Sequence, residues 1–403
     1  MNVITLAFAY LRRRWGQALL SVLVGALGVA AVVTVLTAFD ALPDAAERSW
    51  GGVDLVVGPK GSPLDLVLCC ALHVSDPQGL VSEKAAMGAA SSPLVRTAAP
   101  IALGDNVNGW RIVGTTPAIF AIYHADFAQG DVWTKPLQAV LGAGVARALQ
   151  FKMGDHFVGA HGLAAGGELH SQFPYKVVGI LKPTGSVLDR VVLCDIETVR
   201  YIHRKHAEDE ANETGVAYTY VNLPDAATAV VASYRTPVAA LLVPRLINVN
   251  PALTAASPSF EIARLMSYMR PLSYAALALG VLLVIIAAAG GAAALMATMN
   301  ARTRDLALLR VLGAGPVSIA LVAFCEAGMI AVAALIAGGA LTWALLAIAS
   351  RLLLDRAGLL LVPQIDPDTV IYLIGGAIAV AFAAALVPAI RAVRTSMEEL
   401  LQS

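Results

Sequence analysis

Histidine and cysteine side chains, which can bind metal ions, are concentrated in the middle of this sequence. Three of the four cysteines and every histidine lie there: Cys69, Cys70, Cys194, His73, His124, His156, His161, His170, His203 and His206. Imidazole and thiolate groups bind zinc and copper. Cys69, Cys70 and His73 are close in sequence, and His203 and His206 have the spacing that places two residues on one face of a helix. These five residues are the weak candidates for a metal site.

The spacing of these five residues matches no standard zinc motif. We therefore predict no metal site, and we expect the histidines to be surface or hydrogen-bonded side chains of a polar domain. Cys69 and Cys70 are expected to form a buried pair, or one of them a disulfide with Cys194, rather than a set of ligands.

Glu326 is another residue of chemical interest because it lies inside a long apolar segment. It is the only charged residue between Arg310 and Arg351. An ionisable group within a membrane span is a functional hypothesis by default. Glu326 would either hold helices together through a hydrogen bond or take part in proton or substrate transfer.

The composition places the chain among membrane proteins. Hydrophobic residues make up 58% of the sequence and charged residues 14%, with a mean hydropathy of +0.72. In soluble domains, hydrophobic residues make up about 45–50% and charged residues about 25%. The formal net charge is zero, so the bulk charge gives no support for binding nucleic acid. The fold class predicted is a membrane α-helical protein with four transmembrane helices and an α+β extracytoplasmic domain inserted between the first and second helices.

The span boundaries follow from runs of roughly 20 apolar residues, the length needed to cross a bilayer. The predicted segments are an interfacial helix at 1–14, spans at 15–39, 271–299, 316–350 and 369–391, an outer domain at 40–270, a cytoplasmic segment at 300–315, a periplasmic loop at 351–368 and a tail at 392–403. The first span is longer than the apolar core of a signal peptide, so it is read as an uncleaved anchor.

Arginines set the predicted orientation, because Lys and Arg in short flanking segments mark the cytoplasmic side. They precede the first span, lie between the second and third, and follow the fourth. Both termini are therefore expected in the cytoplasm. In the outer segment, short β-branched runs between turn residues predict strands at 54–58, 110–114, 139–141, 175–181 and 191–194, with helices at 144–150, 195–206 and 257–269.

Residues 299–314 read MNARTRDLALLRVLGA and resemble the R-x-x-E-[IL]-A-[IL]-L-R-A-L-G-A signature of MacB/FtsX-type ABC permeases. Asp305 replaces the usual Glu. Residues 388–394 resemble the family's closing P-A-x-R-A-x-R, although Ser396-Met397 replaces the following D-P. Segments near 112–115, 141–155 and 177–186 are similar to the family's periplasmic core, and Glu326 also matches its pattern.

The resemblance implies a non-catalytic permease subunit of the mechanotransmission type in the bacterial inner membrane. No G-x-x-x-x-G-K-[ST] occurs in the sequence, so ATP and magnesium are expected in a separate ABC ATPase rather than as cofactors of this chain. Other expected partners are a second permease copy or paralogue, membrane lipid and a periplasmic accessory protein. The implied substrate is a lipoprotein, lipid, peptide or drug. The resemblance also favours the pairing role for Glu326, at the interface of a permease dimer.

The segment that would dock on the ATPase combines charge with leucines, a mixed surface suited to a protein groove. Its residues are Arg302, Arg304, Asp305, Leu306, Leu309, Arg310 and Gly313, and the residues of the C-terminal motif are Pro388, Arg391 and Arg394. The simpler interpretation is a positively charged loop without a partner. Two functional alternatives stay open: a mechanotransmitter that regulates a periplasmic enzyme without transport, and metal-linked ABC transport. A membrane enzyme is disfavoured, since no paired catalytic carboxylates lie near a span and no nucleophile elbow is present.

Overall fold

The structure is a computed structural model that describes residues 3–163, 166–214, 225–301, 315–357, 359–362 and 367–394. The chain divides into two compact units. A helical unit comprises residues 1–42, 269–351 and 362–403, and an outer unit comprises residues 43–268 and 352–361.

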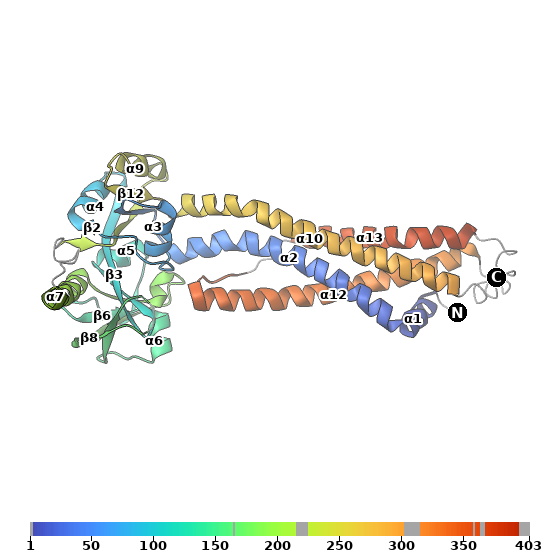
Figure 1. The fold of residues 1–403 in the computed structure, drawn as a ribbon, viewed down its shortest axis with the longest axis horizontal. Helices are drawn as coiled ribbons and strands as arrows, with labels where there is room; N and C mark the ends of the chain where they lie inside the picture. Colours follow the sequence, from blue (N-terminus) through green and yellow to red (C-terminus); the bar gives the residue numbers. More distant parts are fainter. Residues whose placement is uncertain are drawn as a thin grey trace. The chain divides into compact units, whose positions relative to one another are not determined.

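Long apolar helices form the helical unit (Figure 1). They are α2 (Trp15–Trp50), α10 (Pro258–Ala301), α12 (Pro316–Ala357) and α13 (Pro367–Arg394), preceded by the short α1 (Val3–Arg13). Among the described residues, three segments are long and apolar enough to cross a membrane, in α2, α10 and α12, and α13 contains a shorter apolar stretch, Ile374–Val387. The predicted membrane class is confirmed, with the fourth helix the shortest of the set.

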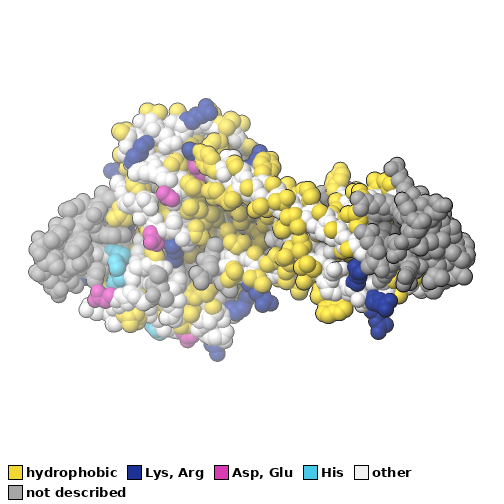
Figure 2. All heavy atoms as spheres, turned by 45° about the vertical axis from the view of Figure 1, so that its right-hand side comes forward, with side chains coloured by type: hydrophobic (Ala, Val, Ile, Leu, Met, Phe, Trp, Pro, Cys, Tyr) yellow, Lys and Arg dark blue, Asp and Glu magenta, His cyan; other side chains and the backbone are white. Residues whose placement is uncertain are grey.

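Large apolar side chains on these helices point outward, as Figure 2 shows for one face. Ile336 is 70% exposed and Trp343 76% exposed, which suits lipid rather than water as the surrounding solvent. Small residues let the helices approach one another. A Cβ atom at Gly28 would lie 2.7 Å from Cγ2 of Val284, and one at Gly338 would lie 2.8 Å from Cβ of Val29, the small-residue packing typical of membrane helices.

The outer unit is built on a ten-stranded mixed sheet with the order β12-β1-β11-β3-β4-β9-β6-β8-β5, and β7 pairs with β3 and β8. The strands are β1 (Leu55–Pro59), β3 (Val95–Val107), β4 (Trp110–Thr115), β5 (Phe127–Gly130), β6 (Gln138–Leu141), β7 (His156–His161), β8 (Leu169–Leu181), β9 (Val191–Asp195), β11 (Ala229–Tyr234) and β12 (Leu253–Ala256). β2 (Val81–Ser82) and β10 (Ala226–Ala227) form a separate pair.

The helices of the outer unit cover both faces of this sheet. They are α3 (Pro63–Cys70), α4 (Glu83–Ala90), α5 (Ala118–Ile122), α6 (Ala143–Leu149), α7 (Ile196–Thr214) and α9 (Ala239–Ile247), with a 3-10 turn, η1 (Val187–Arg190). Figure 1 places α4 and α9 at one end of the unit and α6, β6 and β8 at the other. Alternating residues divide the core: Val140 and Leu193 belong to the cluster around α3 and α5, whereas Leu141 and Val192 belong to the cluster under α7.

The five predicted strands and the three predicted helices of the outer segment are all present, at β1, β4, β6, β8, β9, α6, α7 and the start of α10. The long strand β3 was not predicted, and neither were the strands β2, β5, β7, β10, β11 and β12. In β3 the sequence VRTAAPIALGDNV mixes small and polar residues, so the apolar-polar alternation that indicates a strand is weak there.

The last residues of α12 and the residues directly after them, 352–361, belong to the outer unit. The side chain of Leu359 packs against the core that contains Trp50 and Val187. Nη2 of Arg48 donates to the carbonyl of Leu360 at 3.4 Å, and Nη1 of Arg190 donates to the carbonyl of Leu354. Packing and hydrogen bonds therefore join residues 354–360 to the rest of the outer unit.

Candidate functional site

One strand irregularity places a fully buried carboxylate, that of Asp105, inside the outer unit. The pairing of β3 with β4 shifts between Leu103 and Asp105, so that Gly104 is an extra residue on β3. Side chains alternate between the faces of a strand, and one inserted residue reverses the alternation that follows. The bulge therefore turns Asp105 to the face of its partner Ile112, which lies in the core under α7.

The next residue, Asn106, fixes the end of β7 beside this bulge. Its Nδ2 donates to the carbonyl oxygens of Ala160 and Gly162, at 3.3 Å and 3.0 Å, and its Oδ1 accepts a bond from a backbone N–H in the turn after β3. The N–H of Gly162 donates to the carbonyl of Gly104 at 2.7 Å. His161 lies between Ala160 and Gly162 and pairs with Asp105 across the strands, so the backbone itself brings these two side chains together.

Two further histidines reach Asp105 from other elements. His170 lies near the start of β8, and His203 lies on α7, which packs on β3 and β4. A Cβ atom at Gly104 would come within 2.6 Å of Nε2 of His203. The absence of a side chain at Gly104 is therefore what lets the His203 ring approach the strand.

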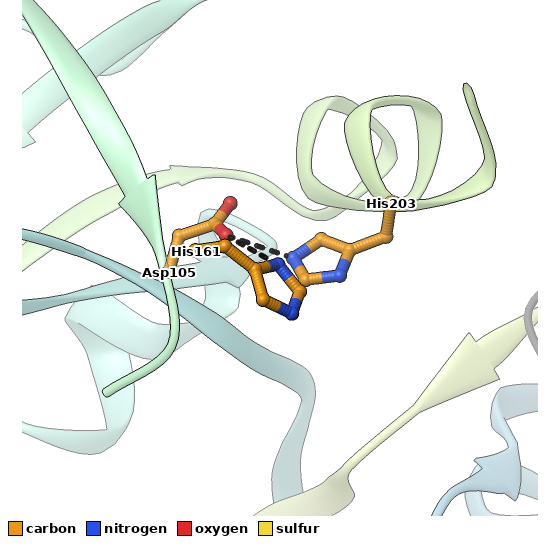
Figure 3. Close-up of side chains that lie close together, drawn as sticks. All are labelled: Asp105, His161 and His203. Atoms are coloured by element: carbon orange, nitrogen blue, oxygen red, sulfur yellow. Dashed lines mark ion pairs between the residues drawn. The ribbon is translucent and has the colours of Figure 1, made fainter. Parts of the chain in front are cut away.

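The three histidine side chains converge on one carboxylate oxygen of Asp105 (Figure 3 shows Asp105 with His161 and His203). From Asp105 Oδ1, Nε2 of His203 lies at 3.0 Å, Nε2 of His170 at 3.2 Å and Nδ1 of His161 at 3.9 Å. The ring centroids of the three histidines are 5.2–6.2 Å apart. We call Asp105, His161, His170 and His203 the histidine-aspartate cluster.

Burial differs sharply within the histidine-aspartate cluster. The side chain of Asp105 is 0% exposed, those of His170 and His203 are nearly buried, and that of His161 is 46% exposed. Burial by itself would raise the pKa of Asp105, but hydrogen bonds and positive charge from His170 and His203 outweigh it and hold the pKa well below its usual range. Asp105 is therefore a buried carboxylate kept in its ionised form by imidazoles.

Of the metal candidates predicted from sequence, the structure places only His203 in this cluster. Cys69 and Cys70 lie in the core on the opposite face of the sheet. His73 follows them, and burial, with the nearby charge of Arg111, lowers its pKa to about 3. The side chain of His206 lies outside the described residues.

The three outer-unit cysteines are free and buried. Cys194 belongs to the core under α7, whereas Cys69 and Cys70 belong to the core on the other face. The buried-pair interpretation of Cys69 and Cys70 is confirmed. The alternative of a disulfide to Cys194 is wrong, because the sheet separates the thiols.

The residues predicted to contact the ATPase lie outside the described residues. This holds for every residue from Arg302 to Gly313, and it holds for the side chains of the C-terminal motif at Pro388, Arg391 and Arg394. Glu326 is described and is 6% exposed within α12, beside the helix-packing cluster that contains Ala327.

Sequence reasoning missed Asp105, His161 and His170. The available signal was the polar run Gly104-Asp105-Asn106 inside an otherwise apolar stretch, followed more than fifty residues later by the histidines at 161 and 170. Nothing in the local sequence shows that these positions become neighbours, because the pairing of β3 with β7 is a long-range contact.

Comparison with known families matches nearly the whole chain in two parts. Residues 18–235 match the MacB-like periplasmic core domain, and residues 277–397 match the FtsX-like permease C-terminal domain. A search of curated proteins gave no significant match.

Solved structures similar to the outer unit include the periplasmic region of MacB from Actinobacillus actinomycetemcomitans. It shares 12% sequence identity, with a TM-score of 0.33, and the alignment covers 54% of this chain and 94% of that one. Another is the extracellular domain of the noncanonic ABC-type transporter YknZ from Gram-positive bacteria. It also shares 12% identity, with a TM-score of 0.29, and the alignment covers 50% of this chain and 98% of that one.

Proposed function

Because this chain belongs to the MacB/FtsX-type family of ABC permeases, we propose that it couples ATP hydrolysis by a separate ATPase to mechanical work on an envelope substrate. The substrate would be a lipoprotein, lipid, peptide or drug that is extruded or extracted. ATP and magnesium would be bound by the ATPase and not by this chain. The permease would work in the bacterial inner membrane as a pair of copies, or with a paralogue, with both termini in the cytoplasm.

The observation that carries this proposal is the set of chain connections between the two units. α2 and α10 continue from the helical unit into the outer unit. The end of α12 does so too, since residues 352–361 belong to the outer unit and α12 ends at Ala357. Arg48 and Arg190 bond to the backbone of this last segment. A displacement of the membrane helices would therefore be transmitted to the outer unit along three connections rather than one.

Prolines occur near two of these connections. Pro43 lies within α2 at the first residue of the outer unit, and Pro271 lies within α10 two residues after the helical unit resumes at Met269. A proline inside a helix removes one backbone hydrogen bond and favours a bend. These positions are suited to a hinge through which helix motion changes the orientation of the outer unit.

The segment from Arg302 to Gly313 would dock on the ATPase and receive its motion, as its sequence predicts. Leu309→Asp would place a charge in the leucine surface that docks on the ATPase, and the complex should then fail to assemble. Leu246→Asp is a matched control, since Leu246 lies on α9 and is 71% exposed. Co-purification of the tagged permease measures assembly, and normal assembly and ATP hydrolysis with Leu309→Asp would contradict the docking assignment.

The mechanical part of the proposal is tested by hydrogen exchange on the permease-ATPase complex in lipid nanodiscs. We expect ATP-bound and ATP-free complexes to differ in exchange at residues 352–361 and around Arg190. The Arg48→Ala and Arg190→Ala double variant should keep the ATPase bound but lose this difference. Identical exchange with and without ATP in the unaltered complex would refute mechanical transmission. Co-purification of a cell-wall hydrolase, with no cargo that stimulates the ATPase, would instead assign the permease to regulation without transport.

Glu326 is proposed to pair helices at the permease dimer interface. Glu326 is 6% exposed in the single chain, and ionisable residues within membrane spans generally face the helix bundle and pair there. Glu326→Gln keeps the hydrogen-bonding capacity and should preserve the oligomeric state, whereas Glu326→Leu should weaken it. Native mass spectrometry distinguishes the two results, and loss of function with Glu326→Gln in an intact oligomer would instead favour a proton-transfer role.

A further inference from the structure

The donor atoms of Asp105, His161 and His203 have the spacing of a metal site. One ligand atom from each of the three residues lies within 4.8 Å of the other two, and the nitrogens of His203 and His161 lie 3.0 Å and 3.9 Å from Asp105 Oδ1. In tetrahedral zinc coordination, bonds of about 2.0–2.2 Å imply donor atoms about 3.3–3.6 Å apart. The two separations from Asp105 Oδ1 lie on either side of that range.

We propose that Asp105, His161 and His203 bind a divalent first-row transition-metal ion, of which Zn²⁺ is the best fit. Two imidazole nitrogens and one carboxylate oxygen are a donor set that binds zinc while leaving a further position for water or another ligand. The site belongs to the outer unit alone, so it does not depend on the proposed coupling to an ATPase.

The structure supports each ligand through neighbouring groups, as metal sites generally require. The bulge at Gly104 aims Asp105 into the site and leaves room for the His203 ring. Asn106 holds the backbone on both sides of His161. His170 bonds to Asp105 at 3.2 Å, and this bond would orient the carboxylate in the way that outer partners of metal ligands do.

The proposed metal site combines buried ligands with one side that is open to solvent. Asp105 and His203 are almost fully buried, but the His161 side chain is 46% exposed and forms the open side. An ion could enter past His161 and be held by two ligands that need no rearrangement. Such a site allows exchange with the surrounding solution, in contrast to a closed structural site.

The alternative is a hydrogen-bonded network without a metal, and it leaves one feature unexplained. A carboxylate oxygen has two lone pairs, and His203 and His170, at 3.0 Å and 3.2 Å, can occupy both on Oδ1 of Asp105. His161 nevertheless faces the same oxygen at 3.9 Å, beyond hydrogen-bond distance of it. Oδ2 of the same carboxylate is buried and has no hydrogen-bond partner among the described residues. A buried acceptor without a partner is rare and calls for an explanation. A cation bound by both carboxylate oxygens, and by the imidazoles of His161 and His203, would give Oδ2 a partner.

The test uses the full-length protein purified in detergent and stripped of metal with a chelator. Titration with Zn²⁺ against a competing chelator measures affinity, and elemental analysis after dialysis measures stoichiometry. We expect one high-affinity zinc per chain, and we expect His161→Ala to weaken binding by more than the roughly 10–100-fold typical of changes to outer partners. His156→Ala is the matched control, since His156 is an exposed histidine on the same strand, β7, and it should bind zinc like the unaltered protein.

Measurements on His161→Ala can also refute the metal site. His161 is the exposed ligand, so His161→Ala should fold even where Asp105→Asn or His203→Gln does not. Equal zinc affinity in His161→Ala and the unaltered protein, or no stoichiometric zinc at micromolar free metal, would overturn the site. Substitution with Co²⁺ gives an independent measurement. Visible absorption of the tetrahedral type is expected in the unaltered protein and should be lost in His161→Ala, and its persistence there would place the metal elsewhere.

Discussion

The close approach of the His203 ring to Gly104 makes the substitution Gly104→Ala a sensitive probe of the histidine-aspartate cluster. The new Cβ would lie 2.6 Å from Nε2 of His203 and closer still to Cε1, well inside the 3.5–4.0 Å of a relaxed contact. The strand cannot retreat easily, because Gly104 accepts a bond from the N–H of Gly162 and lies in the central part of the sheet. The ring of His203, or α7 with it, must move away.

Overpacking of this kind costs about 1–3 kcal/mol. For a domain of this size, each kcal/mol lowers the melting temperature by about 2–4 °C, so Gly104→Ala should melt about 2–12 °C below the unaltered protein. The matched control is Gly88→Ala in α4, where a Cβ would meet no atom within 4 Å. Alanine in a helix is about 0.5–1 kcal/mol more favourable than glycine, so the control should melt slightly higher.

Differential scanning fluorimetry of both variants in the same detergent measures the two shifts. An unchanged or raised melting temperature for Gly104→Ala would refute the packing described for the cluster. If the metal site is correct, Gly104→Ala should also weaken zinc binding, because it displaces a ligand. Gly88→Ala should leave zinc binding unchanged.

Three further predictions concern other buried groups of the outer unit. Arg200 is 5% exposed and is bonded to Glu83, Glu197 and the carbonyl of Ala226, so Arg200→Met should lower the free energy of unfolding by about 2–4 kcal/mol. Denaturant titration would show this, whereas Glu197→Gln, at a side chain 63% exposed, should cost less than about 1 kcal/mol. Burial lowers the pKa of His73 from 6.5 to about 3. Between about pH 3 and pH 6.5 the unfolded chain therefore binds a proton at His73 that the folded chain does not. The free energy of unfolding should fall as the pH drops from about 6.5 towards 3. His73→Gln should flatten this decline by up to about 1.4 kcal/mol per pH unit, and an unaltered pH profile would contradict the assignment. Burial raises the pKa of Cys194, so thiol reagents followed by mass spectrometry should label it only after denaturation, and labelling of the folded protein would show that its thiol is accessible.

Much of the architecture could be predicted from sequence because its signals are local. An apolar run such as the one that begins at Trp15 identifies a membrane helix by length and composition alone. Strands such as β9 are short β-branched runs between turn residues, and they were found where predicted. The family resemblance at residues 299–314 was also a local pattern, and the matched permease domain includes it.

The sequence was less informative where several elements meet. The strand β3 is central to the sheet, yet its small and polar residues gave no alternating pattern. The sequence alone also left open which cysteines meet, whereas the sheet places Cys69 and Cys194 on opposite faces. Pairing between strands depends on contacts far apart in the chain, and a local pattern carries no information about them.

The sequence by itself determined that this chain is a membrane permease with one inserted outer domain, because hydropathy and short motifs act over a few neighbouring residues. It also showed that every histidine lies in the outer segment. Only the tertiary structure decided which histidines lie beside Asp105 in the histidine-aspartate cluster. The bulge at Gly104 reverses the direction of Asp105, and the pairing of β3 with β7 brings His161 to it. α7 then adds His203 from almost a hundred residues along the chain. The cluster is thus a product of strand register and helix packing, two properties that arise only when the whole sheet is assembled.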